Sequence, residues 1–165
     1  MITAHLPSGY VLGRVLGANA SLAMGVVVLG AIFPDFDLAW FYWVDERAFH
    51  HHRYWVHAPW FWVMVGIIGV PTLAMISRKV LRLGLLFMCG VFLHILLDSI
   101  AGGIMWLWPW VGTLYQLVTV QPTHSHFILS FMAHWTFLLE IAIWVTALLL
   151  IWPRANGPRD RRHPK

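Results

Sequence analysis

The sequence contains little charge and almost no cysteine. Charged residues make up 11% of its 165 residues, whereas soluble domains contain about 25%. This excludes a disordered chain and a charged coiled coil, both of which need many polar residues. Cys89 is the only cysteine, so an intramolecular disulfide and a thiolate metal cluster are also excluded.

Apolar residues are abundant instead. Hydrophobic residues account for 59% of the chain, and eleven residues are tryptophan. A domain of this length cannot hide so much apolar surface from water. We therefore expect one helical membrane domain over residues 1–153, followed by a basic tail over residues 154–165.

Four segments are long and apolar enough to cross a bilayer, which needs about 20 residues each. Two further segments are too short, too charged or too interrupted to cross, and are expected to be interfacial or re-entrant. The predicted fold class is an all-α integral membrane protein with about four transmembrane helices. The expected spans are residues 15–34, 54–77, 80–97 and 135–152, and the two other segments are residues 38–49 and 104–120.

Lysine and arginine concentrate at the ends of these segments. They lie at Arg14, in the turn at residues 78–82 and in the tail at residues 154–165. The positive-inside rule places all three on the cytoplasmic side, which predicts a multi-pass membrane protein with cytoplasmic termini. The pattern points to the lipid bilayer as partner and not to nucleic acid.

Histidine and aspartate gather at the opposite ends of the predicted spans. His94 and Asp98 are four residues apart on one helix face. Asp35 and Asp37 follow a proline, where two carboxylates can point to one side. Imidazole and carboxylate ligands together suit Zn²⁺, Mn²⁺ or Fe²⁺ better than Mg²⁺ or Ca²⁺. Such patterns are weak singly, but together on one membrane face they indicate a site for a divalent metal ion, with zinc favoured.

Other histidines near this face have two possible roles. His52 and His57 flank Arg53 and supply two more imidazoles. His124 and His126 either complete the metal shell or belong to a hydrogen-bonded interfacial loop, and the sequence leaves both open.

Five short motifs follow one another over residues 1 to about 110. They are His5-x-x-x-Gly9, Gly30-Ala-Ile-Phe-Pro-Asp-Phe-Asp37, His51-His-Arg-Tyr-Trp-Val-His57, His94-Ile-Leu-Leu-Asp98 and Gly103-Ile-Met-Trp-Leu-Trp-Pro109. In order and approximate spacing they resemble the motifs of the YdjM-like family of membrane-bound predicted metal-dependent hydrolases. One departure is Ala58, where the family pattern has serine.

The resemblance implies a small protein of a bacterial inner membrane with a histidine–aspartate metal centre. It also implies a distant relation to zinc phospholipase C-like enzymes. His5 reaches the other ligands only if the first segment folds back near residues 17–21, because one helix over residues 9–33 would keep it about 30 Å away. The family pattern favours the hairpin, and the length of the apolar run favours a single span. The implied ligands are His5, Asp35, Asp37, His52, His57, His94 and Asp98.

The predicted function is hydrolysis of a phosphoester or lipid-headgroup substrate at the outer membrane interface. A carboxylate not needed for the metal ion, Asp35 or Asp37, is the candidate general base. Arg53 is a candidate phosphate clamp, with an interfacial anchor or an ion pair to Asp45 or Glu46 as the alternative. The competing interpretations are a metal-ion or proton transporter, a haem-binding protein and a structural membrane protein.

Overall fold

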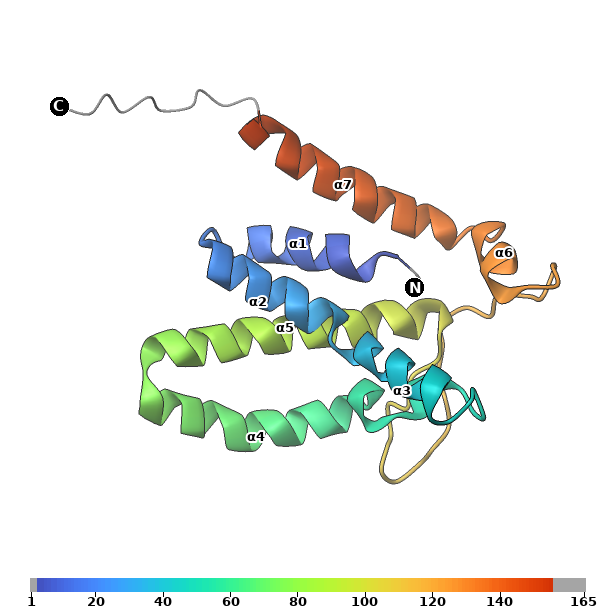
Figure 1. Cartoon of the computed structure of the whole chain (residues 1–165), viewed down its shortest axis with the longest axis horizontal. Helices are drawn as coiled ribbons and strands as arrows, with labels where there is room; N and C mark the ends of the chain where they lie inside the picture. Colours follow the sequence, from blue (N-terminus) through green and yellow to red (C-terminus); the bar gives the residue numbers. More distant parts are fainter. Residues whose placement is uncertain (1–2, 156–165) are drawn as a thin grey trace.

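The computed structural model describes residues 3–155, and its regular elements are helices joined by loops (Figure 1). No strand forms in this part of the chain, where one isolated bridge joins Ile104 to Tyr115. The predicted all-α class is therefore confirmed. The α-helices are α1 (His5–Val15), α2 (Ser21–Ile32), α3 (Asp37–Trp43), α4 (Pro59–Ile76), α5 (Arg78–Ala101), α6 (Phe127–Met132) and α7 (Phe137–Ala155), and the 3-10 turns are η1 (Pro34–Phe36), η2 (His51–Arg53) and η3 (Trp55–His57).

The first apolar segment forms a hairpin and not one span. α1 ends before Gly17, whose φ of 66° lies in the left-handed region that suits glycine. α2 then runs back along α1, and Gly9 lies so close that a Cβ atom there would be 2.7 Å from the Cβ of Ala31. The prediction of a single helix over residues 15–34 is wrong, because the left-handed turn reverses the chain and small residues let the two helices pack.

Fewer helices are long enough to cross a membrane than the four predicted. α4 and α5 meet the length and hydropathy expected of a span. α2 together with η1 and α3 would be a third, bent by 57°. The apolar part of α7, Phe137–Trp152, is shorter. The fourth predicted segment is thus helical, but the described residues contain two candidate spans, or three if the bent pair counts as one.

α2 crosses α5 at very close range. A Cβ atom on Gly30 would overlap the carbonyl oxygen of Phe87, and one on Gly90 would overlap the carbonyl oxygen of Val27. Two glycines at the crossing therefore let the backbones touch, as small residues do between membrane helices. The contact fixes the end of α2 beside the last turns of α5, where the predicted site residues lie.

α7 runs alongside α1 in the same direction. Glu140 accepts hydrogen bonds from the backbone N–H and the hydroxyl of Thr3, and Arg14 donates to the carbonyl of Leu150. The start of α1 consequently lies at one end of the helical layer and the end of α7 at the other (Figure 1). The prediction of two cytoplasmic termini depended on a single first span, and the hairpin removes that support.

Of the two segments that were predicted not to cross the membrane, one is partly helical and the other is a loop. Residues 38–49 begin as helix α3, whose aromatic side chains Trp40 and Trp43 are exposed. Residues 104–120 form an irregular loop. α7 continues through Ala155, so the tail predicted from residue 154 begins within that helix, and residues 156–165 lie outside the described part of the chain.

Candidate metal centre

Imidazoles and carboxylates from six elements meet at one end of the helical layer. α1 contributes its first residue, η1 and α3 contribute the acidic pair that follows α2, η2 and η3 contribute histidines, and α5 contributes one imidazole and one carboxylate from its last two turns. Seven residues predicted from sequence are brought together here. They are His5, Asp35, Asp37, His52, His57, His94 and Asp98.

One group of possible ligands surrounds Asp98, which is 1% exposed. His5 Nε2 lies 3.2 Å from Asp98 Oδ1, and His94 Nε2 lies 3.0 Å from Asp98 Oδ2. Asp35 completes the group, with its oxygens 3.7 Å from His94 Nε2 and 4.0 Å from His5 Nε2. Ligands on one zinc ion, at about 2.0–2.2 Å from the metal, lie at comparable distances from each other. The four residues therefore fit a shared cation.

Backbone carbonyls fix the orientation of two of the imidazoles. Nδ1 of His94 donates to the carbonyl oxygen of Ala31 at 2.8 Å. Nδ1 of His52 faces the carbonyl oxygens of Gly102 and Gly103, both at 2.9 Å. With the proton on Nδ1, each ring presents the lone pair of Nε2 toward Asp98, and Nε2 of His52 is 3.4 Å from Oδ2. Metal-binding histidines are held in this way in many proteins.

A second group consists of His51, His52 and His57, with Asp37 beside it. Asp37 Oδ2 lies 3.0 Å from His57 Nδ1, and Asp37 Oδ1 lies 3.7 Å from His51 Nδ1. Neither Asp37 oxygen nor His57 Nδ1 makes a hydrogen bond of good geometry, although all three atoms are buried. Buried polar atoms without such partners are rare and need an explanation.

Electron-rich atoms face each other in both tautomers of a neutral His57. His57 Nε2 is 3.3 Å from His94 Nε2, and the proton of a neutral His94 is on Nδ1. With the His57 proton on Nε2, a lone pair at Nδ1 faces the Asp37 carboxylate; with the proton on Nδ1, the Nε2 lone pairs of His57 and His94 face each other. Burial lowers the pKa of His57, against the opposing charge of Asp37, so a second proton is disfavoured. A cation bound beside these atoms would remove the repulsion.

The environment keeps His52 neutral as well. Burial lowers the pKa of His52 to about 2, although the charge of Asp98 opposes the shift, and the neighbouring His57 lowers it further. A neutral imidazole is the form that binds a metal ion. His5 is also available as a ligand, because both of its ring nitrogens are buried and neither makes a hydrogen bond of good geometry. The donor set thus fits Zn²⁺, Mn²⁺ or Fe²⁺, as predicted from the residue types.

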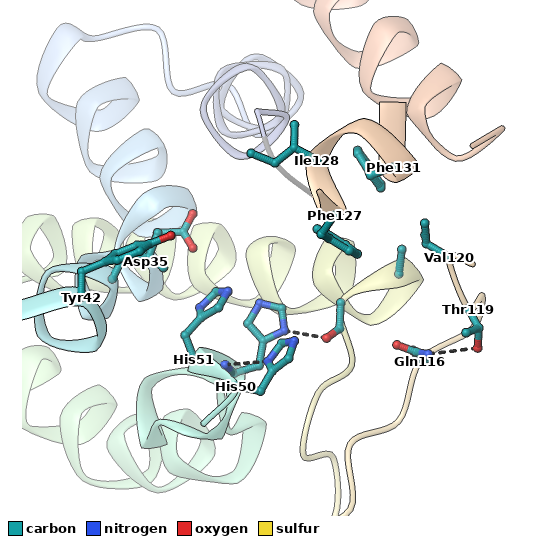
Figure 2. Close-up of a pocket in the computed structure, with 14 residues that line it drawn as sticks. Asp35, Tyr42, His50, His51, Gln116, Thr119, Val120, Phe127, Ile128 and Phe131 are labelled. Carbon is teal, nitrogen blue, oxygen red and sulfur yellow. Dashed lines mark hydrogen bonds between the residues drawn. The ribbon is translucent and has the colours of Figure 1, made fainter. Parts of the chain in front are cut away.

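A pocket of about 490 Å³ opens beside this centre (Figure 2). Asp35, His51 and His52 belong to both the pocket and the cluster of possible ligands. The pocket lies between α3, η2, the end of α5, the following loop and α6. Its other lining residues are Leu38, Tyr42, His50, Ala101, Gly102, Gln116, Thr119, Val120, Phe127, Ile128 and Phe131.

Three predicted site residues lie apart from the cluster. Arg53 is exposed and donates to the carbonyl of Gly112. The exposed His124 contacts Thr123 through its ring, and the exposed His126 ring caps α6 by accepting from the backbone N–H of Ile128. Of the two roles considered for His124 and His126, their contacts correspond to membership of a hydrogen-bonded loop.

Sequence reasoning does not single out His51 or the pocket wall on α6. His51 stands in a run of three histidines, and only the local 3-10 turn decides which of them face inward. The α6 residues carry no polar signal. Glu140 holds the residues before α1, and the sequence indicates its importance only in that it is the one acidic residue in the last apolar run.

Fold and site together define a helical membrane protein with a buried histidine–aspartate cluster at one end of its helices. A model of the YdjM inner membrane protein family matches residues 1–157. The chain therefore belongs to this family, as its motifs indicate. No curated protein and no solved structure matches significantly.

Proposed function

We propose that the protein is a membrane-bound metal-dependent hydrolase acting on a phosphoester, with a lipid headgroup as the favoured substrate. The supporting observation is the meeting of His5, Asp98 and His94 from distant parts of the chain at hydrogen-bonding distances. Nothing in an ordinary membrane helix packing requires three such groups to be buried together, since each carries a desolvation cost.

The burial and position of each residue in the site assign it a different chemical role. A bound divalent cation supplies Lewis acidity toward a phosphoryl or acyl oxygen and activates water. Asp98 is deeply buried and serves to hold the cation. Asp35 has a side chain that is 29% exposed and lines the pocket, so it is placed to accept a proton from water. Arg53 donates to the carbonyl of Gly112 and does not line the pocket, so binding of the substrate is assigned to the pocket residues.

The distribution of positive charge favours a site on the outer side of the membrane. Arg78, Lys79 and Arg82 lie at the beginning of α5, and Asp98 lies near its end. The positive-inside rule places the basic end in the cytoplasm. In this orientation Thr3 lies on the outer side with the site, and the end of α7 lies on the cytoplasmic side.

Transport of a metal ion or proton is the alternative. A transport path needs ionisable groups spaced through the membrane. The histidines and aspartates of the cluster instead gather at one end, and Glu140 is bonded to Thr3, two residues before His5 at that same end. This arrangement favours a fixed site over a path.

Metal analysis and hydrolysis assays test the proposal together. The purified full chain is expected to carry stoichiometric divalent metal by mass spectrometry and to hydrolyse bis(p-nitrophenyl) phosphate when loaded with Zn²⁺, Mn²⁺ or Fe²⁺. Asp98→Ala and His57→Ala are expected to lose both properties. Asp45→Ala is the control, because Asp45 accepts a hydrogen bond from Tyr54 outside the cluster. Equal and negligible metal in all forms would contradict the proposal.

A further inference from the structure

The pocket beside the metal centre has two chemically different walls. One wall carries the possible metal ligands Asp35, His51 and His52. The opposite wall is formed by Phe127, Ile128 and Phe131 of α6 (Figure 2). A pocket built in this way suits a molecule whose polar and apolar parts are joined.

Helix α6 also exposes apolar side chains away from the pocket. Leu129, Met132 and the following Trp135 are 50%, 51% and 57% exposed. Exposed aliphatic and aromatic side chains on a short helix at the end of membrane spans are typical of a segment at the lipid boundary. The helix therefore has lipid-facing side chains on one side and the pocket on the other.

The charges of the pocket narrow the possible ligand. Among its described lining residues there is no lysine or arginine, and Asp35 is acidic. A small, soluble, multiply charged anion would find no fixed positive partner other than a bound metal ion. The apolar α6 wall would also stay uncovered by such a ligand. Both features disfavour a soluble phosphate ester and favour an amphiphile.

We infer that the pocket binds a membrane lipid, with its headgroup against the metal centre and its acyl chain along Phe127, Ile128 and Phe131. The lipid reaches the pocket sideways from the bilayer, past α6. This assignment rests on the proposed function and specifies its substrate class. The α6 wall then selects for a long apolar chain, while Gln116 and Thr119 on the facing loop contact the polar part.

Photochemical labelling within a bilayer tests the lipid assignment. The full chain, loaded with Zn²⁺, is reconstituted in vesicles of phosphatidylethanolamine and phosphatidylglycerol that contain a phospholipid with a diazirine in its acyl chain. After irradiation, labelled residues are located by mass spectrometry. We expect label on Val120 and Phe131, in addition to the exposed side of α6. Phe131 is only 1% exposed, so bulk lipid does not reach it.

Two neighbouring substitutions provide a matched comparison. Ile128 lines the pocket and is 43% exposed, whereas Leu129 is 50% exposed and lies outside the pocket lining. Ile128→Asn is expected to lower the labelling of Val120 and Phe131 at least about fivefold, because a polar amide against an acyl chain is disfavoured. Leu129→Asn is expected to leave it unchanged. Wild-type metal content in both variants verifies that they are folded.

The outcomes separate this inference from the proposed function. Label confined to exposed residues, in protein that does carry metal, would overturn the lipid assignment alone. Equal loss of label in both variants would also overturn it, since the α6 wall would then have no special role. Absence of metal from the wild-type protein would overturn the hydrolase proposal, whatever the labelling shows.

Discussion

His5 and Asp98 are in direct contact, with Nε2 of the imidazole 3.2 Å from Oδ1 of the carboxylate. The ring of His5 is also stacked on that of His94, with centroids 3.8 Å apart. The contact joins the beginning of the chain to the end of α5. It exists only because the first apolar segment turns back at Gly17.

Removal of His5 tests whether this contact belongs to a metal centre. His5→Ala is expected to lower metal affinity by more than the 10–100-fold typical of residues that merely support a ligand. Isothermal titration with Zn²⁺ measures the change. His134→Ala is the control, because the ring of His134 contacts Thr136 outside the cluster. Unchanged affinity in His5→Ala would exclude His5 as a ligand.

Gly102 is expected to be required for the position of His52. A Cβ atom on Gly102 would overlap Cε1 of the His52 ring, so Gly102→Ala displaces the ring from its carbonyl partners. We expect metal affinity to fall at least about tenfold, as for the loss of other contacts that orient a ligand. Gly112→Ala is the matched control, because a Cβ atom there meets nothing within 4 Å. A wild-type affinity in Gly102→Ala would show that His52 is not a ligand.

Glu140 is expected to position His5 by anchoring the residues before it. Its carboxylate accepts two hydrogen bonds from Thr3, and hydrogen bonds to a charged group contribute about 1.5–3 kcal/mol each. Glu140→Ala is expected to weaken metal binding, whereas Glu140→Gln retains an acceptor and should keep most of the affinity. Thr146→Val on the same helix is the control, since Thr146 bonds only within α7 among the described contacts. Titration with Zn²⁺ distinguishes these variants, and equal affinity in the alanine and glutamine variants would contradict this role.

The crossing of α2 and α5 is expected to tolerate no added side chain. Gly30→Ala places a methyl group against the carbonyl of Phe87, and overpacking of this kind costs about 1–3 kcal/mol. Thermal unfolding in detergent is expected to occur at a lower temperature. Gly25→Ala is the comparison within the same helix, because its Cβ atom meets nothing within 4 Å and alanine favours a helix by about 0.8–1.0 kcal/mol over glycine. Similar stability for both variants would contradict the close crossing.

The helical class and much of the ligand set were accessible from the sequence. Long apolar runs require helices in a bilayer, since only helices satisfy their own backbone groups there. The spacing of His94 and Asp98 places both on one helix face. The acidic pair Asp35 and Asp37 ends an apolar run and therefore lies at a membrane face.

The hairpin of α1 and α2 could not be predicted from hydropathy. Residues 15–34 are as apolar as a true span, and hydropathy does not register the φ of 66° at Gly17 or the close packing of Gly9 on Ala31. The apolar wall of the pocket on α6 could not be predicted from the sequence for a related reason. Phe127, Ile128 and Phe131 are ordinary membrane residues in the sequence, and they line the pocket only because α6 packs beside the end of α5.

Composition and local spacing are enough to establish that this chain is helical, membrane-embedded and supplied with imidazole and carboxylate groups at helix ends. Which of these groups meet depends on how the helices pack. Hydrogen bonds from Nδ1 of His94 to Ala31, and from Nδ1 of His52 to the carbonyls after α5, orient the rings toward Asp98. Such orientation depends on contacts between distant segments, which local sequence does not encode.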